Sequence, residues 1–375
     1  MLHYFLAPLG DSFLPFNLFT YISFRAAGAM LTALVIAFAV GPAMIRKLRD
    51  LKVGQVIRAE GPASHQAKRG TPTMGGLIIV AATIIPVLLW ARIDNRFVIL
   101  TMVAMLLMAG IGFLDDWLKV VQGQSRGLVA KWKLVGQVSF GLFLGIVLLK
   151  WPVVDPATIP AAATTVPFFK YLLVIFAPWL YVVFVTGVLT GFSNAVNLTD
   201  GLDGLAAGLS AIAAGAFAFL AYIAGRTDTT GYLNLFFLPG AGELAVFCSA
   251  LMGACLGFLW FNAHPAKVFM GDTGSLSIGG TFGTIAILLK AEFLLVIIGG
   301  VFVVEALSVM VQTSVFKYFR WSRGREYAEA HRVFRMAPIH HHFEKLGWHE
   351  ITVVVRFWIL GIFCALAALA TLKLR

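Results

Sequence analysis

Apolar runs of roughly twenty residues recur from one end of this chain to the other, and they decide its fold class. A helix of about 20 residues spans the hydrocarbon core of a bilayer, and within lipid a helix satisfies its own backbone hydrogen bonds. With 59% hydrophobic and 13% charged residues, we predict an all-α polytopic membrane protein, a single integral membrane domain over residues 1–375. About ten transmembrane helices are expected, at residues 24–45, 73–90, 97–114, 134–150, 171–189, 202–224, 244–261, 276–289, 293–316 and 351–372.

Lysine and arginine are unevenly distributed among the loops that join these runs. If both termini lie outside, in the periplasm, the cytoplasmic loops hold nineteen of them and the outer loops and ends hold eight. The positive-inside rule favours this orientation. No lysine or arginine precedes Arg25 and no small-residue cleavage site follows the first run, so we expect no removable signal peptide. The three cysteines, Cys248, Cys255 and Cys364, fall inside apolar runs and are interpreted as packing residues.

One polar stretch stands between the fifth and sixth runs and carries Asn194, Asn197, Asp200 and Asp203. A carboxylate at a helix centre in lipid costs about 2.5 to 3.5 kcal/mol on insertion scales, so these groups should lie at a membrane surface or in a wet cleft. If a helix begins near Thr199, the two aspartates share a face, which would suit a cation or a metal-bound phosphate. A turn and helix cap would explain the same residues without a ligand.

Three further polar clusters fall on the same side of the membrane under this orientation. They are the pair Asp115-Asp116 after the third run, the segment at residues 260–275 and the triplet at residues 340–342. Their coincidence predicts one site, an active-site cleft on the cytoplasmic face. The net charge of +11 lies mostly in the same loops, so the site should attract anions. Attraction to anionic lipid headgroups would also explain much of this basicity.

The aspartate pair has a plain alternative explanation. Asp115 and Asp116 are about 100° apart on a regular helix, so they cannot both chelate one ion unless the helix end frays. Asp115 and Lys119 share a face and could form an ordinary surface ion pair. That alternative explains Asp116 poorly, because Asp116 continues almost directly from the apolar run.

The segment around residues 269–275 also has two interpretations. Residues 271–275 (GDTGS) predict a tight turn into the eighth span, whose exposed amides could receive phosphate oxygens, or simply a helix cap. Phe269 is either a buried anchor or a stacking platform for a base, and the sequence slightly favours the anchor.

Two polar features lie near the carboxyl end of the chain. The triplet His340, His341 and His342 lacks the spacing of a zinc site, and donation to phosphate or sugar oxygens is the better interpretation. Inside the ninth span, Glu305 and Ser308 form a polar stripe that continues to Gln312. This stripe should point into protein rather than lipid, and a structural network is the favoured interpretation.

Five motifs together resemble one family across essentially the whole chain. They are residues 68–76 (KRGTPTMGG), 115–119 (DDWLK), 194–204 (NAVNLTDGLDG), 262–275 (NAHPAKVFMGDTGS) and 337–344 (APIHHHFE). They resemble the bacterial phospho-N-acetylmuramoyl-pentapeptide transferases, a branch of the polyprenyl-phosphate N-acetylhexosamine-1-phosphate transferase superfamily. The aspartate motifs are shared by that superfamily, whereas the last motif resembles the muramoyl branch specifically.

The resemblance implies a Mg²⁺-dependent reaction at the inner face of the bacterial cytoplasmic membrane. Undecaprenyl phosphate would attack the β-phosphate of UDP-N-acetylmuramoyl-pentapeptide, giving lipid I and UMP. Both substrates are anionic, so a divalent ion and lysines fit this chemistry.

The same resemblance implies roles for individual residues. Asp272 would ligate Mg²⁺, and Asp115 and Asp116 would face the lipid phosphate. Lys119 and Lys131 would neutralise charge, and the three histidines would contact the diphosphate or sugar. The uridine would be held by Lys68, Asn262, Asp203 and Phe269, and the neighbouring substrate-binding region would include Thr73, Asn194, Asn197 and Asp200.

Other classes of protein remain as alternatives. A sibling transferase that uses another UDP-N-acetylhexosamine would keep every aspartate motif. A divalent-cation transporter would place its carboxylates near the bilayer midplane, often in duplicated halves, and a scaffold protein would not need them to converge. The expected partners are the two substrates, membrane lipids and, by resemblance alone, a second copy of the chain in a homodimer; no nucleic acid is expected.

Overall fold

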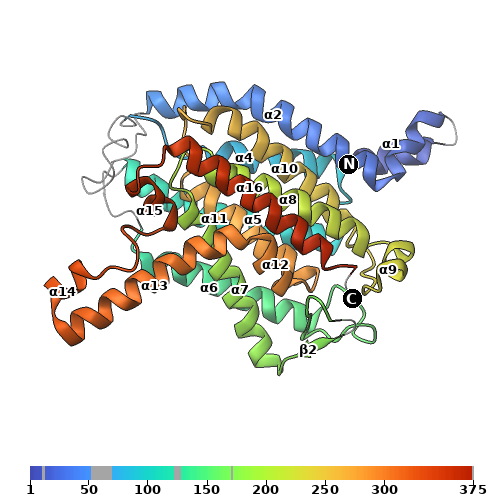
Figure 1. The fold of residues 1–375 in the computed structure, drawn as a ribbon. Coiled ribbons are helices and arrows are strands. Elements are labelled where there is room, and N and C mark those ends of the chain that lie inside the picture. Colours follow the sequence, from blue (N-terminus) through green and yellow to red (C-terminus); the bar gives the residue numbers. More distant parts are fainter. Residues whose placement is uncertain (11–12, 52–69, 122–127, 170–171, 374–375) are drawn as a thin grey trace.

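The protein is a bundle of long helices, seen in a computed structural model that describes residues 1–10, 13–51, 70–121, 128–169 and 172–373. Figure 1 shows these helices packed side by side. The long helices are α2 (Ile22–Asp50), α4 (Gly76–Trp90), α5 (Arg96–Val121), α6 (Ala130–Lys150), α7 (Pro178–Thr199), α8 (Leu205–Ala224), α10 (Glu243–Asn262), α11 (Gly271–Leu288), α13 (Gly300–Arg323) and α16 (Glu350–Ala370).

Short elements connect or precede them. They are α1 (Leu2–Leu6), the 3₁₀ turns Ala7–Leu9 and Leu14–Thr20, α9 (Thr227–Leu233), α12 (Glu292–Ile298), α14 (Arg325–Ala330) and α15 (Ile339–Lys345). Each of the ten predicted apolar spans overlaps a long helix, but the ninth, predicted at residues 293–316, is divided at Gly299 into α12 and the first part of α13. Within the described residues, eight helices are long and apolar enough to cross a membrane, and α4 is a shorter apolar helix. The chain is therefore a polytopic membrane protein.

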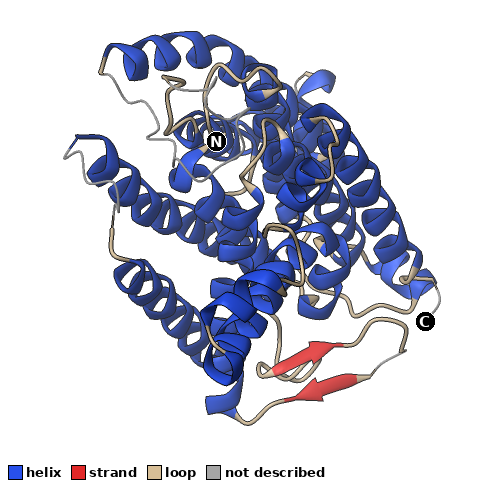
Figure 2. Cartoon of the chain, turned by 60° about the vertical axis from the view of Figure 1, so that its left-hand side comes forward, coloured by secondary structure: helices blue, strands red, loops and turns tan. Residues whose placement is uncertain are grey.

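A two-stranded hairpin corrects the all-α expectation. Strands β1 (Ala163–Thr165) and β2 (Leu173–Ile175) pair antiparallel with Thr164 opposite Val174, and Figure 2 shows them at one edge of the bundle. Because β2 occupies the start of the predicted fifth span, α7 begins only at Pro178, a residue suited to a first helical position. The helix then continues to Thr199, so that Asn194 and Asn197 are helical.

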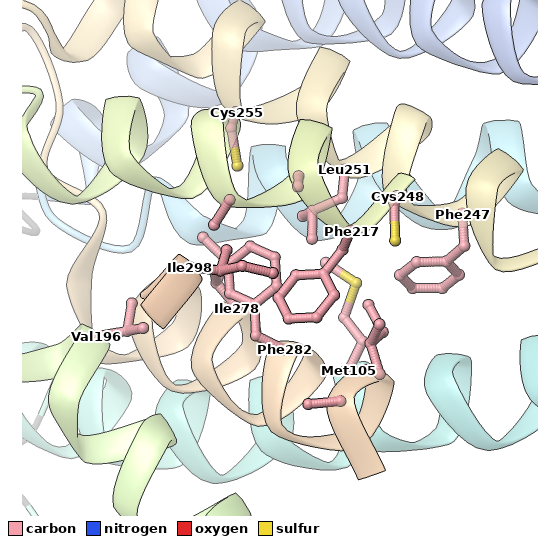
Figure 3. Close-up of a cluster of buried hydrophobic side chains, with 14 of the residues drawn as sticks. Met105, Val196, Phe217, Phe247, Cys248, Leu251, Cys255, Ile278, Phe282 and Ile298 are labelled. Carbon is pink, nitrogen blue, oxygen red and sulfur yellow. The ribbon is translucent and has the colours of Figure 1, made fainter. Parts of the chain in front are cut away.

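The core is centred on α8, α10 and α11. Helix α11 is buried from Thr273 to Leu288, as expected for a helix surrounded by others on all sides. Figure 3 shows Phe217 of α8 beside Phe282 of α11, and the two rings are stacked with centroids 5.8 Å apart. Cys248 and Cys255 are fully buried nearby, which confirms the packing role predicted for them.

A buried ion pair joins the helices at one end of the bundle. The Arg25 guanidinium donates to both carboxylate oxygens of Glu243, at 2.7 and 2.6 Å, and also to the Trp90 carbonyl at 3.2 Å. The Arg92 amide donates to the same carboxylate at 3.0 Å. The pair therefore connects α2, the α4–α5 turn and α10. Both chain ends lie on this side in Figure 1.

This pair should contribute strongly to stability, because removing one partner leaves an uncompensated buried charge that costs about 3 to 5 kcal/mol. We expect Glu243→Ala to lower the melting temperature of the detergent-purified protein sharply. Arg25→Met combined with Glu243→Leu should recover part of the loss. Asp228→Ala, which breaks the exposed pair with Arg226, serves as the control, and an equally large effect there would contradict the prediction.

Candidate active site

Three carboxylates meet at the end of the bundle where α5 finishes and α11 begins. Asp115 and Asp116 lie near the carboxyl end of α5, Asp272 lies in the first turn of α11, and one oxygen from each lies within 4.8 Å of the others. The two helices approach closely because Gly112 has no side chain: a Cβ there would collide with the Asp272 carbonyl. The structure thus brings together the three aspartates that the sequence singled out.

Asp116 binds the amino terminus of α11. Its carboxylate accepts the backbone amides of Asp272 and Thr273 at 3.2 and 2.9 Å and the Thr273 hydroxyl at 2.7 Å. The backbone of Gly271 also lies near Asp200, where it partly opposes the rise in the pKa of that carboxyl. The expectation that the amides of Asp272 and Thr273 are exposed for phosphate oxygens is therefore wrong, since the Asp116 carboxylate already occupies them. Helix α5 stays regular through Asp115 and Asp116. The two carboxylates therefore reach the same cluster without fraying of the helix end.

Two lysines bridge the other two carboxylates. Lys119 contacts Asp115 and lies 3.1 Å from Asp272, whereas Lys133 contacts Asp272 and lies 3.1 Å from Asp115. Asp115 is fully buried and also accepts the Leu128 amide at 2.8 Å. The Asp115–Lys119 ion pair predicted as an alternative does form, but it is part of this larger network.

Lys133 is a site residue that the sequence analysis missed. The lysine expected there, Lys131, has an exposed side chain with its ammonium 5.9 Å from the Trp132 ring centroid. Lys133 shares a face of α6 with Gln137, which is almost fully buried. A glutamine within an apolar run was the available signal for the face of α6 that turns toward the protein.

The two asparagines of α7 differ in their surroundings. The Asn197 amide donates to Asp272 Oδ1 and to the Ser275 hydroxyl, both at 2.8 Å, and so orients the Asp272 carboxylate. Asn194 donates to Gln137 and to the Thr190 carbonyl, also at 2.8 Å. Asn197 therefore lies in the carboxylate cluster, and Asn194 lies in the packing behind it.

The connection between α7 and α8, residues 200–204, is a turn and not the start of a helix. Asp200 and Asp203 consequently do not share a helical face. Burial first, and then the negative charges of Asp272 and Asp116, raise the pKa of Asp200 to about 8. The Asp203 side chain faces away from the carboxylate cluster. It accepts hydrogen bonds from His264 Nδ1 and from the Ala266 amide, each at 3.1 Å.

The predicted uridine-binding residues lie around this turn and the segment before α11. Asn262 is buried and links the two, accepting the Gly204 amide at 3.0 Å and donating to the Val268 carbonyl at 2.9 Å. Val268 and Met270 are fully buried, whereas Phe269 between them is half-buried. This alternation makes the flanking residues the anchors.

The remaining predicted residues on this side come from the segment before α4. Thr73 is buried against Gly271, where a Cβ would lie 2.8 Å from the Thr73 hydroxyl. Three backbone hydrogen bonds join this segment to the one before α11: the Phe269 amide donates to the Pro72 carbonyl, and the amides of Gly75 and Gly76 donate to the carbonyls of Phe269 and Met270. Lys68 lies outside the described residues.

The three histidines point in different directions, as their consecutive positions predict. His340 is fully buried beside Glu305, with Nδ1 3.1 Å from a carboxylate oxygen. His341 Nδ1 lies 2.7 Å from Glu344, and His342 Nδ1 accepts the Arg335 amide at 3.1 Å. His340 also touches Gly201 in the α7–α8 turn, so it is in contact with the segment that carries Asp200.

Within the described part of the chain, two groups of side chains could hold a metal ion. Asp115, Asp116 and Asp272 offer only oxygen atoms, the donors that Mg²⁺ prefers. Asp203, His264 and Glu350 form the second group. The first group fits a divalent cation better, because anionic Asp115 and Asp272 face one another and already attract the two lysine ammoniums.

Comparisons with known proteins agree with this arrangement. The glycosyl transferase family 4 model matches residues 98–290, and signature 1 of the phospho-N-acetylmuramoyl-pentapeptide-transferases matches residues 68–80. Proteins of that name from Gemmatimonas aurantiaca and Desulfotalea psychrophila are 58% and 48% identical, each over 100% of both chains. A third from a Geobacter species is 50% identical over 100% of both chains. The chain therefore belongs to the phospho-N-acetylmuramoyl-pentapeptide-transferase family.

Proposed function

We propose that this protein transfers phospho-N-acetylmuramoyl-pentapeptide from its UDP-linked donor to undecaprenyl phosphate, forming lipid I and UMP in peptidoglycan biosynthesis. The observation that carries the proposal is the cluster of Asp115, Asp116 and Asp272 with Lys119 and Lys133 between them. Such a cluster suits the joining of two phosphate-bearing substrates, because the lysines and a divalent ion neutralise their charges. Family membership specifies the donor and acceptor.

The proposed setting is the bacterial cytoplasmic membrane, with one domain of ten spans and both termini in the periplasm. An even number of spans agrees with the position of both chain ends on one side of the bundle in Figure 1. The carboxylates lie where α5 ends and α11 begins, away from the Arg25–Glu243 pair, and the excess of lysine and arginine favours the cytoplasm for that side. A homodimer is proposed from the family resemblance alone.

Mg²⁺ is the proposed cofactor, with Asp272 as its principal ligand and Asp115 beside it. When bound, the ion would offset the charge of the donor diphosphate. The protein's own groups then have distinct roles: Asn197 orients the Asp272 carboxylate, and Asp116 fixes the Asp272 backbone. Lys119 and Lys133 can turn their ammoniums toward the phosphates, since both are partly exposed.

The donor nucleotide is proposed to bind along the segment before α11. Phe269 would stack on the uracil, with Asn262 and Asp203 shaping the pocket through their bonds to Gly204 and Ala266. Thr73 would line this region from the segment before α4, and Lys68 is proposed as a uridine ligand from the family resemblance alone. His341 and His342 are proposed to contact the diphosphate or sugar. The half-buried ring of Phe269 between two buried residues favours the platform over the anchor.

The direct test compares two donors. Purified protein with undecaprenyl phosphate and Mg²⁺ should release UMP from UDP-N-acetylmuramoyl-pentapeptide and not from UDP-N-acetylglucosamine. Chelation of the metal should stop the release, and added Mg²⁺ should restore it. Preference for the second donor would show that the chain is a sibling transferase, and no release from either would refute the proposal.

Lys133 should matter more for catalysis than Lys131. Loss of one group that stabilises developing negative charge costs about 10² to 10³ in kcat, and Lys133 is the lysine that reaches Asp115 and Asp272. We expect Lys133→Met to reduce UMP release far more than Lys131→Met at equal protein and saturating substrates. The reverse order would assign the role to Lys131, as the family resemblance implied.

Phe269→Ala should weaken nucleotide binding without weakening lipid binding, since base stacking on an aromatic side chain is worth about 1 to 3 kcal/mol. Affinity for UDP-N-acetylmuramoyl-pentapeptide and KM for undecaprenyl phosphate are the two measurements. Val268→Ala is the matched control: it removes a buried anchor, so it should lower the melting temperature and spare nucleotide affinity. If Phe269→Ala behaves like Val268→Ala, the ring is only an anchor.

The acceptor should attack the donor directly. The second pKa of a phosphate monoester is about 6, so undecaprenyl phosphate is already a competent nucleophile at neutral pH and needs neither a general base nor a phospho-enzyme. On this view the role of Asp115 and Asp116 is to position the phosphate of the lipid acceptor. We expect no exchange of labelled UMP into the donor when lipid is absent, and such exchange in lipid-free protein would indicate a phospho-enzyme.

A further inference from the structure

Glu305 is a fully buried acid in the middle of α13. A buried carboxylate is costly unless another group compensates it. Its nearest ionisable partner is His340 of α15, whose Nδ1 lies 3.1 Å from one carboxylate oxygen. Among the described residues, the two carboxylate oxygens and the two ring nitrogens have no hydrogen-bond partner, so the contact between them is an ion-pair approach and not a formed hydrogen bond. The Glu305 carboxylate and the His340 ring are therefore each other's nearest ionisable partner.

The far side of the same imidazole rests on the α7–α8 turn. A Cβ placed on Gly201 would collide with His340 Nε2. Gly201 has no positive φ, so the glycine is explained by this close approach and not by its backbone conformation. The ring thus fills the space between α13 on one side and the turn on the other.

The turn is held at its ends by hydrogen bonds. The Gly201 amide donates to the Thr199 carbonyl at 2.8 Å, and the Gly204 amide donates to Asn262 at 3.0 Å. The Asp203 amide donates to Glu350 at 3.0 Å. His340 supplies the packing contact at Gly201, next to Asp200, whose carboxyl lies close enough to Asp272 and Asp116 for their charges to raise its pKa.

We propose that Glu305 is a positioning residue for the transfer reaction. It holds the His340 ring against Gly201, and the ring in turn fixes Asp200 relative to Asp272 and Asp116. Glu305 itself does not touch the reactants and acts through His340. This inference rests on the function proposed above, and it gives a use to a buried acid that the charge-neutralising cluster does not involve.

The kinetic test uses Glu305→Gln, which keeps the shape of the side chain and removes its charge. We expect kcat to fall at least about tenfold, which corresponds to about 1.4 kcal/mol, while KM for the donor and for undecaprenyl phosphate change by less than about twofold. Ser308→Ala is the matched control, because this buried hydroxyl one turn along α13 donates to the Glu305 backbone carbonyl and to no other group among the described residues. An unchanged kcat in Glu305→Gln would overturn the proposal.

A double-mutant cycle tests whether Glu305 acts through His340. Residues in direct contact show non-additive effects, whereas independent sites add. We would measure the melting temperatures of Glu305→Gln, His340→Gln and the double variant. The melting temperature of the double variant should be no lower than that of the less stable single variant. Additive losses would mean that the two residues act separately and would refute the pairing.

The contact with Gly201 has its own test, which also serves if Glu305→Gln fails to fold. Gly201→Ala should lower the melting temperature in the wild-type background and much less in His340→Ala, where the added methyl has room. Equal losses in both backgrounds would refute the contact. Because melting temperatures do not depend on the donor, these cycles remain valid if wild-type protein releases no UMP, an outcome that would refute only the proposed function.

Discussion

The site depends first on the contact between Asp116 and the amino terminus of α11. The first amides of a helix have no partner within it and carry partial positive charge, so a buried carboxylate there is favourable for both groups. Asp116 binds the amides of Asp272 and Thr273. Asp272 lies in the first turn of α11, together with the amides that donate these hydrogen bonds. Once the bonds form, the Asp272 side chain is therefore placed opposite Asp115.

Charge balance follows from that placement. Facing carboxylates repel each other, and here the ammoniums of Lys119 and Lys133 lie between Asp115 and Asp272. With Asp116 included, three carboxylates face two ammoniums in the cluster, and the charges of Asp272 and Asp116 add to burial in raising the pKa of Asp200. A divalent cation and anionic substrates can therefore enter together: the ion offsets the carboxylates, and the lysines then become available to phosphate oxygens.

Small residues and buried polar pairs allow the helices to support this site. Glycines at 112 and 201 admit the Asp272 backbone and the His340 ring respectively, and small residues are the usual means of close helix approach in membranes. At the opposite end, the Arg25–Glu243 pair ties α2 to α10. The polar stripe of α13 points into protein as predicted, with Glu305 and Ser308 buried.

Periodic and compositional features of the sequence were sufficient for the class of protein, for the approximate positions of most long helices and for the convergence of Asp115, Asp116 and Asp272. Burial of apolar side chains and the cost of charge in lipid act on each segment by itself, so these features can be predicted locally. The choice of Lys133 over Lys131, the capping role of Asp116, the turn at residues 200–204 and the burial of His340 required the tertiary structure. Each depends on which face of a helix meets a neighbour distant in sequence, and packing between helices decides that.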